Sequence, residues 1–165
     1  MEYEKYTFII RCGEIALKGM NKPYFERLLL ERIKRALKDY KDISAHRSEG
    51  LIFVYASIEN DKSSLIRTIS QVFGVASVSD ACETESDIDV ISKHAVEYMK
   101  DMISSKGIKT FKVEAKRADK SFPIQSPDIS RRIGAAVLKG CGVLKVDVHE
   151  PDCVLFVNVR REHSY

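Results

Sequence analysis

The order of apolar periodicities in the first half of the chain is the feature that most restricts its fold. Runs rich in β-branched and aromatic residues predict strands, and apolar residues three and four positions apart predict helices. The pattern reads strand, helix, strand, strand, helix, strand, at 6–12, 21–40, 43–47, 51–56, 61–74 and 75–82. This order predicts the split βαβ, ferredoxin-like arrangement.

Both helices of this half are expected to bury one face. Asn21 and Pro23 suit a helix start, and Asp61 suits the N-cap of the second helix. The first helix carries a basic face opposite its apolar one. The residues expected to be buried are Phe25, Leu28, Leu29, Ile33, Ala36, Leu37 and Tyr40 in the first helix, and Leu65, Ile69, Val72 and Phe73 in the second.

An acidic stretch, 83–87, is interpreted as a linker that leads into a capped helix. The predicted domains are therefore 1–82 and 83–165, in an α/β (α+β) chain. The second domain is predicted to have an αβαββ core. Its elements are a helix ending at Gly107, a strand at 109–116, a helix from Ser126 to Gly140, and a hairpin of strands at 143–149 and 153–160.

Composition excludes several classes of protein. Hydrophobic residues make up 44% of the 165 and charged residues 31%, which excludes intrinsic disorder. No apolar run is long enough for a membrane span, and the acidic start does not resemble a secretory signal, so we expect a cytoplasmic protein with no membrane partner. The four cysteines form no C-x-x-C pair and are expected to be reduced, buried thiols.

The sequence lacks the motifs of a self-contained enzyme. It has neither a Walker-type phosphate loop nor a G-x-G-x-x-G turn, and its four histidines belong to no local motif with a carboxylate partner. The spacing of Cys141, His149, Cys153 and His163 matches no usual zinc pattern. We expect no catalytic residue, no metal and no cofactor in this chain.

Positive charge is concentrated in one segment. The whole chain has a net charge of only +3, but residues 106–145 hold ten Lys and Arg against three Asp and Glu, a net charge of +7. Such a segment suggests a polyanion-binding surface, although a solvated basic face is the ordinary alternative. The loop before Ser126 and the helix that begins there place cations beside free helix amides, which suits a phosphate.

Most of the candidate RNA-binding residues lie in this segment. Arg117 and Arg132 are expected to converge near the amino end of the Ser126 helix. Phe122 is expected to cap the core under the loop, with stacking on a base as the less favoured alternative. The candidates are Lys116, Arg117, Lys120, Arg131, Arg132 and Lys139, with Arg11, Lys18, Lys22 and Arg27 as weaker ones in the first domain.

Two stretches resemble a known family. The run KVEAKRADKSFPIQSPDISRRIGAAVL resembles a THUMP domain, an RNA-binding module of tRNA-modifying enzymes. IIRCGEIALKG and KPYFERLLLERIKRAL resemble the N-terminal ferredoxin-like domain of ThiI-type tRNA sulfurtransferases, the 4-thiouridine synthetases. The resemblance implies that the two domains hold the acceptor stem and 3′ end of tRNA and present a uridine to a catalytic PP-loop domain.

The same resemblance limits what this chain does by itself. The family's S-G-G-x-D-S loop, which adenylates the uridine with ATP, and its sulfur-carrying cysteine match nothing here, so we expect a binding module and no enzyme. Implied partners are tRNA, a PP-loop domain and a cysteine desulfurase. The alternative is an adaptor that docks on a tRNA-modifying or sulfur-transfer enzyme through a sheet edge. The preferred tRNAs, the oligomeric state and any role in thiamine biosynthesis stay open.

Overall fold

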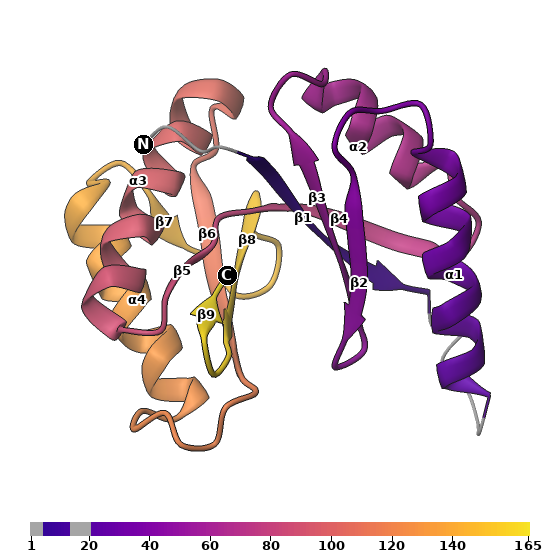
Figure 1. Ribbon diagram of the computed structural model, residues 1–165. Coiled ribbons are helices and arrows are strands. Elements are labelled where there is room, and N and C mark those ends of the chain that lie inside the picture. The colour runs from indigo at the N-terminus through magenta and orange to yellow at the C-terminus, as the bar shows by residue number, and fades with distance from the viewer. Residues whose placement is uncertain (1–4, 14–20) are drawn as a thin grey trace. The chain divides into compact units, whose positions relative to one another are not determined.

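The computed structural model describes residues 5–13 and 21–165 and forms two units, Met1–Ala81 and Cys82–Tyr165 (Figure 1). Each unit is a sheet with two helices, so the predicted mixed α/β class is confirmed. Among the described residues, no helix is both long and apolar enough to cross a bilayer.

The first unit has the predicted order of elements. Its four strands form one antiparallel sheet in the order β2-β3-β1-β4, with α1 and α2 packed on one face. The elements are β1 (Lys5–Cys12), α1 (Lys22–Ala36), β2 (Ser44–Ser48), β3 (Leu51–Ser57), α2 (Lys62–Ser70) and β4 (Val75–Ala81). This is the ferredoxin-like arrangement expected from the sequence.

Local signals account for these boundaries. Glu49 and Gly50 both have positive φ, 51° and 78°, which gives the twist that a two-residue hairpin between β2 and β3 requires. Asp61 accepts a hydrogen bond from the backbone N–H of Ser64 at 2.7 Å and so caps α2, as predicted.

Two aromatic residues predicted to be buried are exposed. Phe25 on α1 is 39% exposed and Phe73 is 85% exposed, so both predictions were wrong. Helical spacing predicted the burial of Phe73 wrongly because α2 ends at Ser70. The chain then turns through Val72 and Gly74 into β4. Beyond the end of a helix, the period that aligns one face no longer applies.

The second unit is a five-stranded sheet in the order β5-β9-β8-β6-β7. Its elements are β5 (Thr84–Glu85), α3 (Ile88–Lys106), β6 (Thr110–Arg117), α4 (Ser126–Gly140), β7 (Lys145–Val146), β8 (Cys153–Val159) and β9 (His163–Ser164). The predicted caps of α3 are confirmed, since Asp87 accepts from two backbone amides and Gly107 adopts the left-handed conformation.

The predicted hairpin of 143–149 with 153–160 was wrong. β7 and β8 lie on opposite sides of β6, and each pairs with it in parallel. The connection crosses beneath the start of β6, where the Asp152 carboxylate accepts hydrogen bonds from the backbone N–H groups of Lys109 and Thr110. Apolar alternation marks strands but does not show which strands are neighbours.

The acidic stretch 83–87 is also more than a linker. Thr84 and Glu85 form β5, which pairs with β9 at the other end of the unit. The Ser86 hydroxyl donates to the Arg160 carbonyl at 2.7 Å and lies 2.9 Å from the Ser164 hydroxyl. This segment is therefore part of the second sheet.

Close contact between α3 and α4 requires a glycine at the end of α4. A Cβ atom on Gly140 would lie only 2.5 Å from Cγ1 of Val96 on α3. Because valine is stiff at χ1, its methyl group has little freedom to move away. Gly140 thus permits the helix packing as well as marking the helix end.

We predict that Gly140→Ala lowers the free energy of unfolding by about 1–3 kcal/mol, the usual cost of overpacking. The measurement is urea unfolding. In a chain that already carries Val96→Ala, the Gly140→Ala substitution should cost much less stability, so the double mutant should show a clear coupling energy. Additive effects of the two substitutions would contradict the close contact.

Candidate nucleic-acid interface

The loop between β6 and α4 is held by its own hydrogen bonds. The Asp119 carboxylate accepts from the Ser121 backbone N–H at 2.9 Å and from the Ser121 hydroxyl. The Ala118 N–H donates to the Val159 carbonyl at 2.9 Å, which ties the loop to the end of β8. These hydrogen bonds at Ala118 and Asp119 hold the backbone that carries the charged side chains of the loop.

Arg117 helps to hold this loop. Its backbone N–H donates to the Ser126 hydroxyl at 3.1 Å, and its guanidinium Nη1 donates to the Phe122 carbonyl at 2.9 Å. The first contact joins the end of β6 to the first residue of α4. Arg117 thus stabilises the loop as well as carrying a positive charge. Its position in a basic loop did not predict this structural role.

The start of α4 favours an anion through the helix dipole. Gln125 stands at the N-cap without a side-chain capping bond, and Pro127 lies in the first turn. Because proline has no N–H and the Asp128 N–H donates to the Gln125 carbonyl at 3.0 Å, the helix dipole is what favours negative charge here. Asp128 in the same turn opposes this effect, and its carboxylate forms a 2.7 Å ion pair with Arg131.

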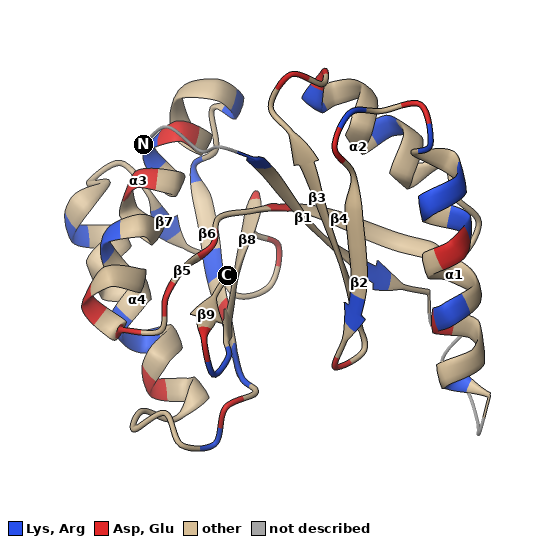
Figure 2. Cartoon of the chain, viewed as in Figure 1, with Lys and Arg blue, Asp and Glu red and all other residues tan. Residues whose placement is uncertain are grey.

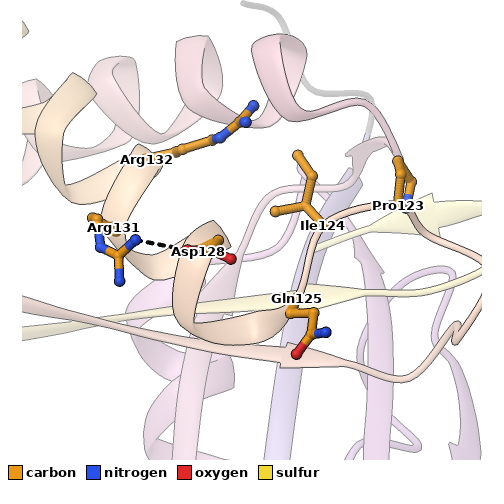
Figure 3. A pocket seen from close by; sticks show the side chains of 6 residues that line it. All are labelled: Pro123, Ile124, Gln125, Asp128, Arg131 and Arg132. Atoms are coloured by element: carbon orange, nitrogen blue, oxygen red, sulfur yellow. Dashed lines mark hydrogen bonds and ion pairs between the residues drawn. The ribbon is translucent and has the colours of Figure 1, made fainter.

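A shallow pocket of about 540 Å³ opens beside this helix start (Figure 3). In Figure 3, Arg131 turns toward Asp128, whereas Arg132 points away from that pair and extends on the side of Ile124. The residues that line the pocket are Pro123, Ile124, Gln125, Asp128, Arg131 and Arg132. The structure therefore brings Arg131 and Arg132 to one hollow, and Arg117 is not among its lining residues.

The candidate lysines fall at two separate places. Lys116 and Lys120 are exposed at the end of β6 and in the loop. Lys139 is exposed in the last turn of α4, roughly 20 Å along the helix axis from Ser126. Phe122 is 8% exposed and belongs to the core with Ile129 and Val159, as its favoured interpretation expected.

The first-unit candidates lie on different elements. Arg11 on β1 is half-buried and donates to the Ser79 hydroxyl at 2.9 Å. Arg27 is exposed on α1, and the Lys22 ammonium at the start of α1 lies 3.9 Å from Glu26. Lys18 lies outside the described residues. Figure 2 shows basic positions along α1 and around the loop between β6 and α4.

The burial of the Glu26 carboxylate was not predicted from the sequence. Glu26 on α1 is only 6% exposed, and its Oε2 forms a 3.0 Å ion pair with Arg47 of β2. Arg47 also donates to the Pro23 carbonyl, so it joins the start of α1 to the edge strand. Glu26 lies between apolar neighbours at helical spacing, but the sequence alone does not show which arginine would pair with it.

Three of the four thiols are weak nucleophiles at neutral pH. Burial is the main cause that raises the pKa of Cys12, Cys141 and Cys153 above the ordinary value. These side chains therefore stay protonated at neutral pH, when a thiol is a weak nucleophile. All four cysteines are free of disulfides, but Cys82 and Cys153 are only partly buried, so the expectation of buried thiols was wrong for these two.

Comparison with known proteins assigns both units. Residues 7–79 match the sequence model of the ThiI ferredoxin-like domain, and residues 85–165 match that of the THUMP domain. A probable tRNA sulfurtransferase of Acetivibrio thermocellus is 41% identical over 98% of this chain and 41% of its own length. One from Thermoanaerobacter sp. strain X514 is 45% identical over 92% of this chain and 38% of its own. The chain thus spans about two fifths of these relatives.

Two solved structures are similar to this chain. A 4-thiouridine synthetase crystallised with RNA and ATP is similar with a TM-score of 0.76 and 31% identity, over 98% of this chain and 40% of its own. A protein of Pyrococcus horikoshii is similar with a TM-score of 0.77 and 25% identity, over 97% of this chain and 53% of its own.

The hydrogen bonds of the loop lead to a pH prediction. Bonds from the Ser121 hydroxyl and N–H lower the pKa of Asp119 below the ordinary value. Since the folded pKa is the lower one, this turn stabilises the fold above about pH 4 and loses that effect as the pH falls further. Carboxyl NMR titration should show Ser121→Ala moving the Asp119 midpoint upward, while the control Ser104→Ala leaves it unchanged. An unmoved midpoint in Ser121→Ala would contradict the turn.

Proposed function

The chain consists of a ThiI-type ferredoxin-like domain and a THUMP domain, and on this premise we propose that it is a tRNA-binding module. The observation that carries the proposal is the basic loop with the α4 start, where Arg132, Lys116 and Lys120 are exposed around the amino end of the helix. These groups suit backbone phosphates, which dominate affinity for nucleic acids.

The finer proposal is that the module holds the acceptor stem and 3′ end of tRNA for 4-thiouridine formation. The likeness to a synthetase crystallised with RNA supports it. The mechanism would be positioning: phosphate contacts fix the register of the RNA without reacting with it. Arg131 and Arg132 would act at the pocket and Lys139 farther along α4, while Arg27 and Lys22 would make separate contacts from the first unit.

Catalysis is assigned to another domain. The relatives named as tRNA sulfurtransferases are about two and a half times as long as this chain, as the 41% coverage implies. We place ATP use and sulfur transfer in a PP-loop domain, with a cysteine desulfurase as sulfur source, in the cytoplasm. The raised thiol pKa values of Cys141 and Cys153 support this division, because a sulfur carrier needs a reactive thiolate.

One observation favours a second function. The segment around the edge strand β7 exposes Val143, Val146 and Val148, at 71%, 52% and 61%. An exposed apolar edge suits protein docking, as the adaptor alternative expects. A complex formed through these valines would depend little on salt.

We predict that tRNA binding depends steeply on salt. If about four to six phosphates are neutralised, log K should fall against log[salt] with a slope of about −3 to −5. Filter-binding titrations between low and moderate salt measure this slope. A flat dependence would favour the adaptor.

Arg132→Ala should weaken tRNA binding by about 1–2 kcal/mol, between the usual values for a neutral hydrogen bond and for one to a charged group. Stability should change by less than about 0.5 kcal/mol because Arg132 is exposed. Arg117→Ala should in addition destabilise the fold, since it removes the bond to Phe122. Lys100→Ala on α3 is the charge-matched control; an equal loss there would indicate diffuse electrostatics.

The chain alone should not thiolate tRNA. The assay incubates it with tRNA, ATP and a sulfur donor and reads the absorbance of 4-thiouridine. Product formed by this chain without another protein would refute the assignment of catalysis elsewhere.

A further inference from the structure

We propose that Phe73 and Arg32 form a stacking site for an unpaired nucleobase of RNA on the first unit. This inference rests on the proposed tRNA binding and adds a contact outside the THUMP domain. Phe73 is the most exposed large hydrophobic side chain among the described residues, at 85%. The Arg32 guanidinium carbon lies 5.9 Å from the centre of its ring, within the range of a cation–π contact.

The backbone beneath Phe73 is fixed. Gly74 has a φ of +104°, a conformation that favours glycine, and a Cβ there would meet Leu29 of α1 at 3.4 Å. The Gly74 carbonyl accepts a hydrogen bond from the Gly13 N–H at 2.9 Å, which ties the turn to the end of β1. A ring held on such a turn loses little conformational freedom when a base stacks on it.

The helix that carries Arg32 has a positive net charge. Between Lys22 and Lys38 the chain has six Lys and Arg against two Glu, a net charge of +4. Arg32 and Arg35 lie on one side of α1 and are both exposed. The phosphate attached to a stacked base would therefore meet compensating charge.

This chemistry favours RNA over a protein partner. Sequence-tolerant binding of single strands combines aromatic side chains with a positively charged surface. The core of a protein interface is depleted of lysine, whereas Lys34 on α1 and Lys38 just after this helix are both exposed. An aromatic ring with a guanidinium over it, next to such charges, fits a base and its phosphate.

The chain contains no tryptophan, so Phe73→Trp would introduce a single fluorescent reporter at the site. The probes are a tRNA transcript, a single-stranded RNA hexamer and a blunt RNA duplex. We expect tRNA and the hexamer to quench the emission at least about twofold at saturation, and the duplex to quench it much less. Phe73→Ala should weaken tRNA binding about fivefold or more, as expected for the loss of one stacked base.

Ile58→Trp and Ile58→Ala are the matched controls, because Ile58 is another exposed apolar residue of the first unit, at 46%. Both should bind tRNA like the parent chain, with unquenched emission from the Ile58→Trp variant. Circular dichroism checks that each variant folds. If the parent chain binds tRNA while Phe73→Ala binds equally well and Phe73→Trp emission is unchanged, the inference is overturned and the proposed function survives. If the parent chain binds no tRNA, both fail.

Discussion

Parallel pairing of β8 with β6 fixes the geometry on which the basic loop depends. The register matches Lys116 with Asn158 and Arg117 with Val159, so both strands end at the same level. The Val159 carbonyl can then accept from Ala118, and the Ser126 hydroxyl can accept from Arg117. These contacts set where β6 ends and where α4 begins. The sheet therefore fixes the position of the charged loop.

The first unit was largely predictable from sequence because each of its elements carries a local signal. The alternation of the strands, the Asp61 cap and the Glu49–Gly50 turn act over a few residues. The errors arose where a position depends on distant parts of the chain. Phe73 was assigned to a helix face that had already ended, and 143–149 was paired with 153–160 although β6 separates them.

The candidate site was predictable as a charged segment but not in its contacts. Composition identified Arg117, Arg131 and Arg132 as a group, whereas hydrogen bonds distinguish them. Arg117 holds the loop, Arg131 pairs with Asp128, and Arg132 extends beside the pocket. Such assignments depend on which carbonyl or carboxylate lies within reach of a guanidinium, and a single sequence does not contain that information.

The central claim is that RNA meets this chain at the loop end of β6, and lysine footprinting tests it most directly. Lys116 and Lys120 lie at that end, whereas Lys106 and Lys109 precede the opposite end of the strand, roughly 20 Å away, and all four are exposed. Limited acetylation with and without tRNA, read by mass spectrometry, compares the two pairs. The account predicts protection of Lys116 and Lys120 with little change at Lys106 and Lys109. Equal protection of all four lysines, or protection of the second pair alone, would contradict it.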